Sequence, residues 1–514
     1  MDSHTDDSRT PASEHVVVVG GGPVGLWLAC ELRTAGVPTT VLERTAERSP
    51  HSKALGIHAR TVEVLGMRGA EERFLEEGMK VPNWHFGMLA ARIDLSALRT
   101  PHPYMLGLPQ ARTEEILEAR ARAMGATVLR SHTVTGLLQD DSGVSLQVTG
   151  PTGSHVRRAA FVVGCDGAGS TVRKAAGIGF PGTEARVHGI VGDVHLPDLG
   201  AGERLQMINE HGALIIVPIP GGLHRVAGVD PLHQEPGTTL TLEGLRTWMV
   251  RAAGTDFGVT APRWLSRFGN ATRQAAAYRN GRVLLAGDAA HMHFPTGGVG
   301  LNVGLQDAMN LGWKLAAHVQ ARADADLLDT YHAERHPVGV ALASHTLAQT
   351  ALISDITPEV LALRDLLGEL IRSGTELGGT LAGLLSGLDV SYAAAEPNSH
   401  CLTGTRVVPT LGPAHSRCSL FDLLRDGHPL FVNFSDEPLI GARRLADSLG
   451  FRVAPGTALD TSDPAWSDVR AAIVRPDGHV WWAGDSAGHA DLPLDDYAQQ
   501  ALAGLRVTFT TPQK

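Results

Sequence analysis

Three stretches of the chain place glycines and a carboxylate directly after an apolar run, a pattern suited to holding a phosphorylated or polyhydroxylated ligand against the backbone. In the first stretch, Gly20, Gly22 and Gly25 follow residues 16–19, which are all valine. The first glycine of G-x-G-x-x-G permits a tight turn, the second lets a pyrophosphate approach the backbone, and the third lets the helix pack on the strand. This stretch therefore predicts a dinucleotide-binding turn.

An acidic residue further along supports this interpretation. Glu43 ends the second apolar run, near the offset of about 20 residues at which a carboxylate meets a ribose hydroxyl. Leu28 and Leu32 recur at helical spacing between the two runs, and Gly36 stops the helix. The segment is thus predicted as a strand–helix–strand unit, with a glycine turn in an unrelated α/β fold as the alternative.

The second stretch, FVVGCDGAGSTVRKAAGI, contains Asp166 and Gly167 after another apolar strand. Ser170 is placed to cap the short helix that follows. Two interpretations remain open at this point: a further part of the ligand site, or a capped strand-to-helix turn that binds nothing.

The third stretch, residues 281–315, has Asp288 after the strand RVLLAG and the glycine-rich PTGGVGLN before a helix. An ionised aspartate only accepts hydrogen bonds, which suits a polyol better than a phosphate. The glycines bring backbone amides, at the positive end of the helix dipole, against something flat and electron-rich. We interpret that group as an isoalloxazine ring, so the predicted ligand is FAD. The predicted apolar face of the helix consists of Leu301, Leu305, Ala308, Gly312 and Leu315.

Chain length and charge limit the class of protein. The 514 residues are too many for one core and predict two or three domains. The formal net charge of -10, without any long basic run, makes nucleic acid a poor partner. The polar N-terminus lacks the features of a signal peptide, and no later apolar run is as long as a membrane span. We therefore expect a cytoplasmic protein with no membrane partner.

Cysteines and histidines do not indicate a redox motif or a metal site. The chain has four cysteines: Cys30, Cys165, Cys401 and Cys418. They form no C-x-x-C and no metal-ligand spacing, so we expect ordinary buried thiols. His291 and His293 lie two residues apart, but no further ligands occur at matching offsets. Loop packing is the expected role of both histidines, and no metal is predicted.

With all three stretches in this order, the chain resembles the class A flavoprotein monooxygenases, the para-hydroxybenzoate hydroxylase family, over roughly residues 15–395. The resemblance implies an α/β fold with a Rossmann-like FAD-binding domain of the glutathione reductase type and an antiparallel β-sheet substrate domain. The segment GIHART and a C-terminal extension are similar to those of actinobacterial aromatic polyketide hydroxylases and rifampicin monooxygenases. In that branch the extension is a thioredoxin-like domain without catalytic residues, so we expect it to be a scaffold.

The resemblance also implies which residues contact the cofactor. It places Gly20, Gly22, Pro23, Val24 and Gly25 at the pyrophosphate, Glu43 and Arg44 at the adenosine, Lys53, Gln110 and Arg112 along the groove, Asp166 and Gly167 at the region shared with NADPH, Asp288 at the ribityl chain, and Pro295, Gly298, Gly300, Leu301 and Asn302 along the flavin. Lys53 stands where relatives often have arginine, and Val299 where many have glutamine. The contacts of these two side chains are therefore left open.

The domains are expected to interleave along the chain. The FAD-binding domain with its terminal helices takes residues 15–80, 105–175 and 276–395, the substrate domain 81–104 and 176–275, and the thioredoxin-like domain 396–514, after a disordered tail of residues 1–14. Alternating stretches such as RLQMINEHGALIIVPIP fit a sheet with one buried face. The predicted wall of the substrate pocket consists of Trp84, His85, Phe86, Met207, Ile216 and Pro295, with ordinary core packing as the alternative.

The activity that the resemblance implies is hydroxylation of a polycyclic phenolic substrate of the polyketide type. NADPH reduces FAD, O2 adds to the reduced flavin, and the resulting C4a-hydroperoxide transfers oxygen to an electron-rich aromatic carbon. The absence of a second dinucleotide fingerprint agrees with transient NADPH binding, and no general base is identified. Baeyer–Villiger insertion, antibiotic-inactivating (rifampicin-type) hydroxylation and a flavin-containing polyketide-binding protein without turnover remain alternatives. The protein is expected to be a monomer or a homodimer.

Overall fold

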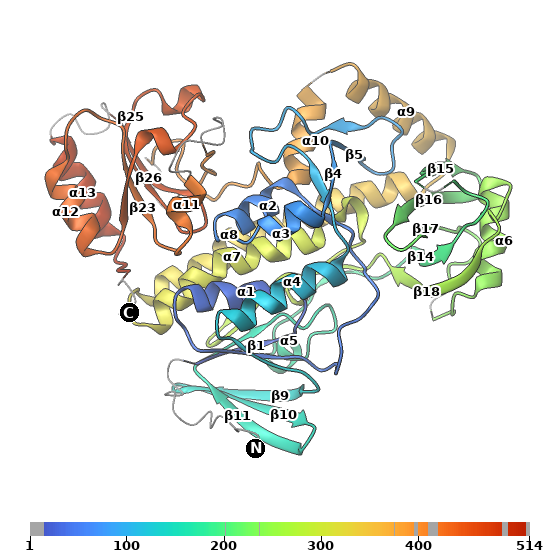
Figure 1. Cartoon of the computed structure of the whole chain (residues 1–514), viewed down its shortest axis with the longest axis horizontal. Helices are drawn as coiled ribbons and strands as arrows, with labels where there is room; N and C mark the ends of the chain where they lie inside the picture. Colours follow the sequence, from blue (N-terminus) through green and yellow to red (C-terminus); the bar gives the residue numbers. More distant parts are fainter. Residues whose placement is uncertain are drawn as a thin grey trace.

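The computed structural model describes residues 15–200, 202–235, 237–374, 376–394, 399–409, 420–485 and 492–509. The predicted tail of residues 1–14 and Cys418 lie outside the described residues. Figure 1 shows a central domain of helices on a sheet, a five-stranded sheet domain in green on one side and the C-terminal domain in red on the other. The mixed α/β class predicted from the sequence is confirmed.

The central sheet has the strand order β20-β21-β12-β1-β2-β8. Its strands are β1 (Val16–Val19), β2 (Thr39–Leu42), β8 (Thr127–Leu129), β12 (Phe161–Gly164), β20 (Arg279–Asn280) and β21 (Val283–Leu285). All of them pair in parallel except β20. Strands β1 and β12 are buried along their whole length, because helices and the neighbouring sheet cover both faces, and this explains their continuous apolar runs.

The register of the parallel strands brings the three motifs to one edge of the sheet. Val19 lies beside Leu42 on one side and Gly164 on the other, and Gly164 lies beside Leu285. The chain passes from β1 to β2 in one direction, whereas β12 and β21 lie in the other, so the carboxyl ends of these strands form a topological switch point, the place where open α/β sheets bind ligands. The residues that follow the four strands therefore lie together at one edge of the sheet.

Helix α7 (Gly300–Val319) packs against α1 (Pro23–Thr34), which also contacts α4 (Gln110–Ala123). Its predicted apolar face is confirmed, since Leu305, Ala308 and Leu315 are fully buried. Polar residues of α7, such as Asp307 and Lys314, are buried as well. The helix therefore runs through the centre of the molecule (Figure 1).

The substrate sheet is antiparallel, with the strand order β15-β16-β17-β14-β18. Its strands are β14 (His188–His195), β15 (Leu205–Asn209), β16 (Gly212–Ile219), β17 (Leu223–Val229) and β18 (Thr260–Gly269). Helix α6 (Leu242–Ala253) packs on one face and buries Leu245 and Trp248 there. The other face of the sheet is directed toward the central domain, because Ala213 and Val229 pack against Phe294 from the third motif.

The C-terminal domain is built on the sheet β24-β23-β25-β26. Its elements are α11 (Leu420–Leu424), β23 (Leu430–Asn433), α12 (Ile440–Ser448), β24 (Arg452–Pro455), β25 (Val469–Val474), β26 (Val480–Asp485) and α13 (Leu494–Gly504). Strands β23 and β24 are parallel, whereas β25 and β26 are antiparallel to their neighbours. A parallel β–α–β unit followed by an antiparallel pair and a helix is the arrangement of a thioredoxin-like domain.

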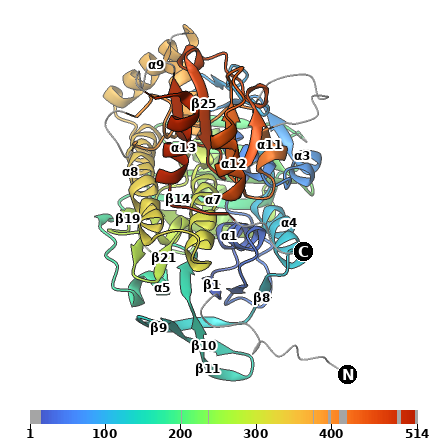
Figure 2. The same ribbon diagram turned by 90° about the vertical axis from the view of Figure 1, so that its left-hand side faces the viewer.

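The remaining elements connect these three parts. They are β3 (Gly56–Ile57), α2 (Ala59–Gly66), α3 (Glu72–Glu77), β4 (Met79–Val81), β5 (Asn83–Trp84), β6 (Ile93–Asp94), β7 (Met105–Gly107), β9 (Thr133–Asp140), β10 (Gly143–Gly150), β11 (Gly153–Ala159), α5 (Thr171–Ala175), β13 (Gly182–Thr183), β19 (Thr272–Gln274), β22 (His291–Met292), α8 (Ala325–Ser354), α9 (Pro358–Arg372) and α10 (Glu376–Ser386). Figure 2 shows β9–β11 projecting from the central domain. In the part of the chain that is described, no helix combines the length and apolarity needed to cross a membrane.

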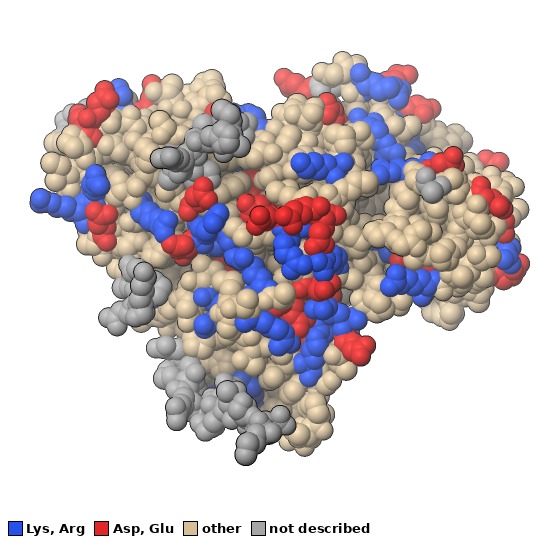
Figure 3. All heavy atoms as spheres, viewed as in Figure 1, with Lys and Arg blue, Asp and Glu red and all other residues tan. Residues whose placement is uncertain are grey.

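Charged side chains of both signs are interspersed on the face shown in Figure 3, with a mixed cluster around α3 and α4. Arg112 of α4 forms an ion pair with Glu77 of α3, and Arg73 pairs with the same Glu77 within α3. This part of the surface therefore presents alternating charge rather than a field of one sign.

Candidate functional site

The first turn of α1 has the geometry required to accept a pyrophosphate. A side chain on Gly20, which has a φ of +110°, would overlap the carbonyl oxygen of Cys165, and one on Gly25 would overlap that of Gly20. At Gly22, by contrast, no described atom lies within 4 Å of the Cβ position. Gly22 is the N-cap residue and, among the described residues, no side chain caps the helix. The free amides and the open space thus fit the predicted phosphate contact.

Glu43 lies beside this turn and is held in place by three hydrogen bonds. Its Oε2 accepts from the Gly21 N–H at 2.8 Å, and its Oε1 accepts from the N–H and the hydroxyl of Thr45 at 2.9 and 2.8 Å. Burial raises the pKa of Glu43, but these donors outweigh it and hold the pKa below its ordinary value. A carboxylate offers about four lone-pair sites, so the ionised side chain keeps capacity for a ribose hydroxyl.

The second motif is organised differently, because its helix is capped by protein. Ser170 Oγ accepts from the Arg173 N–H at 2.9 Å, which confirms the predicted cap. Asp166 accepts from the N–H groups of Thr171 and Val172 at 2.7 and 3.2 Å and from Ser170 Oγ at 2.5 Å. The amides at the start of α5 are therefore already satisfied, although Gly167 beside them faces open space.

Asp288 is the exposed member of a buried turn. Gly287 and Ala289 on either side are buried, whereas Asp288 is exposed, and its carboxylate makes no hydrogen bond within the described part of the chain. A side chain on Gly287 would lie 3.0 Å from Val24 of α1, so the first and third motifs adjoin in space. This free acceptor beside the pyrophosphate turn fits a ribityl chain.

The backbone between Asp288 and α7 presents fixed amide donors. Gly297 and Gly298 both have left-handed φ values, +68° and +69°. The Gly297 carbonyl accepts from His58 Nε2 at 2.9 Å and from Trp84 Nε1 at 3.0 Å. Because C=O and N–H point in opposite directions across a trans peptide, the Gly298 N–H is directed away from His58 and Trp84. Together with the unpaired amides that begin α7, it fits the electron-rich pyrimidine edge of a flavin.

The side chain of Asn302 is used to join segments rather than to face a ligand. Its Oδ1 accepts from the His58 N–H at 2.8 Å, and its Nδ2 donates to the carbonyls of Gly298 and Gly56 at 2.8 and 3.2 Å. The side chain is 2% exposed. Asn302 can therefore contact a flavin only through its backbone, at the start of α7 next to Gly300 and Leu301.

The other residues predicted along the cofactor groove occupy a more exposed strip. Gln110 accepts from the Ala54 N–H at 3.1 Å, and Arg112 binds both carboxylate oxygens of Glu77 at 2.5 and 2.6 Å. Arg44 and Lys53 are exposed. Arg112 lines a cleft of about 560 Å³, which is also lined by Ala46, Glu47, Arg48, Ser49, Pro50, Ala111, Glu115, Glu118, Arg130 and Arg263. These placements leave the predicted cofactor contacts of the four residues as predictions.

The prediction that Met207 and Ile216 line the substrate pocket is wrong. Met207 is paired with Leu214, and Ile216 follows on the same face of β16. Both pack in the core beneath α6, on the face of the sheet opposite the central domain. The alternation of the strands was predicted correctly, but the sequence does not say which of the two faces is covered by a helix of the same domain.

The face directed toward the third motif is made by the neighbouring residues of each strand. One row across the sheet, Ile208, Ala213, Val229, Gly189 and Phe268, packs beneath Phe294 and Met88. Phe268 and Phe294 lie with ring centroids 5.1 Å apart. The next row, Gln206, Ile215, Ala227, Val191 and Ser266, is half-buried. This second row is therefore the open floor of the candidate substrate chamber.

The three predicted residues of segment 84–86 have different roles. Trp84 bonds the Gly297 carbonyl and stacks on His85 with centroids 5.1 Å apart, so both lie at the third motif. Phe86 is 8% exposed and belongs to a core with Val81, Leu89 and α8, which corrects its assignment to the pocket wall. Pro295 is exposed at the start of the Gly297–Gly298 turn.

Several neutral imidazoles surround this turn. Burial lowers the pKa of His58, His85 and His345 to about 4, with only a weak opposing effect from the carbonyl bonded to His58. His291 Nε2 contacts Asp307 at 2.6 Å, and His293 Nδ1 contacts the carbonyl of Phe294 at 2.7 Å. The predicted loop-packing role of His291 and His293 agrees with these contacts.

Residues that sequence reasoning missed include His58, Phe294 and Asp307. His58 lies in the GIHART segment. Phe294 could have been found as the aromatic residue that directly precedes the glycine-rich PTGG. Nothing in the local sequence marks Asp307 as the partner of His291, because the two are joined only by packing of α7 under the loop. The expected burial of all cysteines is also wrong, since Cys401 is exposed.

A Rossmann-like domain whose strand ends hold a pyrophosphate turn, a polyol acceptor and amides for a flavin edge, facing an apolar antiparallel sheet, defines a FAD-dependent monooxygenase. Residues 13–346 match the family model described as FAD binding domain, and residues 400–503 match the one described as aromatic-ring hydroxylase, C-terminal. The chain belongs to this family of FAD-dependent aromatic-ring monooxygenases.

Named relatives cover nearly the whole chain. The chain is 43% identical to 12-dehydrotetracycline 5-monooxygenase/anhydrotetracycline 6-monooxygenase from Streptomyces rimosus, over 91% of this chain and 94% of the relative. It is 40% identical to rifampicin monooxygenase from Streptomyces venezuelae, over 95% and 99%. The solved structure of the anhydrotetracycline hydroxylase OxyS from Streptomyces rimosus superposes with a TM-score of 0.85 at 40% identity, over 97% and 99%.

One further relative carries a name of another kind. Dialkyldecalin synthase from Streptomyces rugosporus is 38% identical over 93% of this chain and 97% of the relative. Its name describes formation of a carbocycle rather than transfer of oxygen.

Proposed function

We propose that the chain hydroxylates a planar, polycyclic phenolic substrate of the polyketide type, with NADPH and O2 as co-substrates. The observation that carries the proposal is the open row on the substrate sheet, Gln206, Ile215, Ala227, Val191 and Ser266. Its middle residues are apolar and small or of medium size, and its two ends are polar. The row crosses five strands, or roughly 19 Å at about 4.8 Å per strand, which suits a flat fused-ring system with polar groups at its ends.

Gln206 supplies a specific contact at one end of this row. Its Nε2 donates to the carbonyls of Met88 and Leu89 at 3.0 and 3.3 Å, which fixes the amide. Its Oε1 is buried and has no hydrogen-bond partner among the described residues. An orphaned buried acceptor is costly, so a substrate hydroxyl that donates to it would be favoured over a ring lacking that hydroxyl.

Bound FAD supplies the redox chemistry, by taking a hydride from the nicotinamide and delivering one oxygen atom of O2 to the ring. Asp288, the Gly298 amide and the start of α7 would hold the flavin. Phe294 and Phe268 close one side of the chamber and exclude water from it. A phenol is activated by its own oxygen, so the protein needs chiefly to orient the ring.

A second candidate function is ring closure without net oxidation, supported by the similarity to dialkyldecalin synthase. In that case FAD and the apolar chamber would shape the substrate, and no oxygen atom would be transferred. Antibiotic inactivation by hydroxylation, supported by the similarity to rifampicin monooxygenase, differs from the main proposal only in the substrate.

The proposal is tested by incubating the FAD-loaded protein with NADPH under labelled O2 and a panel of anhydrotetracycline, aklavinone, rifampicin and a small phenol. We expect a polycyclic phenol to stimulate NADPH oxidation and to gain one labelled oxygen atom. The small phenol should bury less area and give mainly peroxide. Label arriving from water would contradict the proposal, and an isomerised product formed without oxygen uptake would establish the ring-closing alternative.

A further inference from the structure

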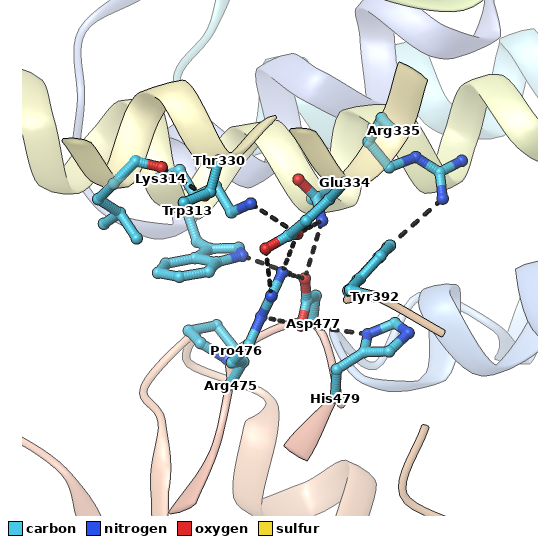
Figure 4. Close-up of polar contacts among 12 residues, drawn as sticks. Trp313, Lys314, Thr330, Glu334, Arg335, Tyr392, Arg475, Pro476, Asp477 and His479 are labelled. Carbon is cyan, nitrogen blue, oxygen red and sulfur yellow. Dashed lines mark hydrogen bonds and ion pairs between the residues drawn. The ribbon is translucent and has the colours of Figure 1, made fainter. Parts of the chain in front are cut away.

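The C-terminal domain inserts one charged turn between helices α7 and α8 of the FAD-binding domain (Figure 4). Arg475, at the end of β25, donates to both carboxylate oxygens of Glu334 on α8 at 2.7 and 2.8 Å. Lys314 of α7, which is fully buried, donates to the same carboxylate at 2.7 Å. Asp477 balances the second positive charge by accepting from Arg475 at 2.5 Å. Two cations and two anions are thus neutralised across the domain interface.

The backbone of the same turn is bound from the opposite side. The Pro476 carbonyl accepts from Arg68 at 3.2 Å, and the Asp477 carbonyl accepts from Arg60 at 2.8 Å. Both arginines are buried and paired with Glu31 and Glu63, respectively. The turn is therefore fixed by Arg60 of α2, by Arg68 just after that helix, and by groups of α7 and α8. A flexible linker between independent domains would show far fewer such contacts.

A short chain of contacts leads from this turn to the flavin-binding loop. The ring of Tyr392 lies against that of His479, with centroids 4.4 Å apart and the planes tilted by 38°, and Arg475 lies over the Tyr392 ring. The Tyr392 hydroxyl accepts from Arg335 at 3.4 Å, as Figure 4 shows. Arg335 is buried and donates through Nε to Asp307 at 2.7 Å.

Asp307 is the residue that reaches the loop itself. Its Oδ2 accepts from the Gly287 N–H at 3.1 Å and contacts His291 Nε2 at 2.6 Å. Gly287 directly precedes Asp288, the free acceptor assigned to the ribityl chain. Burial raises the pKa of Asp307, but Arg335 and His291 outweigh it and hold the pKa below its ordinary value, so the carboxylate stays charged.

We propose that the turn formed by residues 475–479 of the C-terminal domain is a positioning element for FAD, which acts through Tyr392, Arg335 and Asp307 on the loop that carries Asp288. On this proposal the C-terminal domain contributes to the cofactor site in addition to the scaffold role expected from the sequence. Removing the domain would take away the partners that Arg475 and the carbonyls of Pro476 and Asp477 provide for Glu334, Arg68 and Arg60.

The test compares Tyr392→Phe and Arg475→Met with Arg406→Met in the full chain loaded with FAD. Arg406 is a control for the loss of a buried charge at the same domain interface, because it pairs with Glu63 of α2 at 2.8 Å and contacts neither Arg335 nor Asp307. It reaches the turn only indirectly, through Glu63 and Arg60. The thermal midpoint, the dissociation constant for FAD, and the absorption maximum and midpoint potential of the bound flavin are measured for each variant.

All three variants are expected to lower the thermal midpoint. Only Tyr392→Phe and Arg475→Met should also shift the absorption maximum and the midpoint potential of the flavin when the protein is saturated with FAD. Arg475→Met should raise the dissociation constant for FAD by about tenfold. Arg475→Lys should restore part of this loss, because it keeps the charge facing Glu334. If Arg475→Met fails to fold, Tyr392→Phe, which loses a single hydroxyl, decides the question. The proposal is overturned if both variants change only the thermal midpoint, or if Arg406→Met shifts the flavin signals equally.

Discussion

Helices α1 and α5 both begin after a parallel strand and a glycine-containing turn, but their first amides are satisfied in opposite ways. At α5, Ser170 and Asp166 accept the amides of Thr171, Val172 and Arg173. At α1, no side chain in the described structure caps the helix, and the space around Gly22 is open. The first helix is therefore open to an external anion, whereas the second is capped by its own side chains.

This difference shows that a strand–glycine–helix pattern does not by itself define a ligand site. Whether the helix amides are available to a phosphate depends on the N-cap residue, because a serine or aspartate there accepts from the same amides. Helix α7 follows the example of α1, since Val299 at its N-cap offers no side-chain acceptor. Helices α1 and α7 adjoin at Val24 and Gly304, and they lie on either side of the expected path of FAD from pyrophosphate to flavin.

The strongest test of the comparison is to convert α1 into a self-capped helix by Gly22→Asp. Gly22 has an extended backbone that aspartate can adopt, and its Cβ would meet no described atom within 4 Å. The new carboxylate would cap the helix but repel the pyrophosphate by about 4 kcal/mol at roughly 4 Å. We expect FAD affinity to fall by about 1,000-fold while the stability of the apoprotein is kept or raised.

Isothermal titration with FAD and thermal unfolding of the apoprotein measure the two effects separately. Gly22→Ser serves as the control, since it caps the helix without adding charge and should cost much less affinity. Tight FAD binding by the aspartate variant would mean that the pyrophosphate lies elsewhere.

Local patterns were sufficient to predict the elements that hold FAD. The valines of β1, the spacing of Gly20, Gly22 and Gly25, and Ser170 as a cap all depend on neighbours within a few residues, so the sequence contains the whole physical reason for them. The same holds for the apolar face of α7. Parallel pairing then brings the four strand ends together without further information.

Features that depend on contacts between distant segments could not be predicted. Met207 and Ile216 were assigned to the wrong face because the period of a strand does not reveal which face a later helix, α6, will cover. The link from Asp477 to Asp307 joins residues far apart in sequence through side chains that look like ordinary surface charges. Only packing reveals that Lys314 and Arg335 are buried.

Acidification should destabilise the structure around the N-terminus of α7, where His58 contacts Gly297 and Asn302. Burial lowers the pKa of His58 from 6.5 to about 4. Between pH 6.5 and pH 4, the unfolded chain therefore binds a proton at this residue and the folded chain does not. The free energy of unfolding therefore decreases as the pH falls from 6.5 toward 4, by up to about 3 kcal/mol for this residue. Below pH 4 both states are protonated and the loss stops.

Denaturant unfolding at pH 7 and pH 5, for the wild type and for His58→Gln, isolates this contribution. The glutamine keeps a donor for the Gly297 carbonyl but does not titrate, so the variant should lose less stability than the wild type between the two pH values. Equal losses would show that His58 is not excluded from protonation.

Removing the polyol acceptor should have a smaller effect that is confined to the cofactor. Asp288 is exposed and makes no hydrogen bond within the described residues, so Asp288→Ala should leave the stability of the protein without FAD nearly unchanged. Loss of hydrogen bonds to a charged acceptor costs about 1.5–3 kcal/mol, or about 10- to 100-fold in FAD affinity. Unchanged FAD affinity on titration would contradict the assignment to the ribityl chain.

The smallest expected effect, Asp166→Ala, is the counterpart of the Asp288 substitution. Both carboxylate oxygens of Asp166 accept hydrogen bonds from the start of α5. Its removal should therefore lower the free energy of unfolding by about 1 kcal/mol, the usual value of a helix cap. FAD affinity should change less than it does in Asp288→Ala, because the helix amides are still partly satisfied by Ser170. Chemical unfolding of the apoprotein and FAD titration, made side by side on the two variants, give the required pair of numbers. If Asp166→Ala kept its stability but bound FAD much more weakly, Asp166 would contact the cofactor directly. The proposed difference between α1 as a ligand-binding helix and α5 as a self-capped helix would then be wrong.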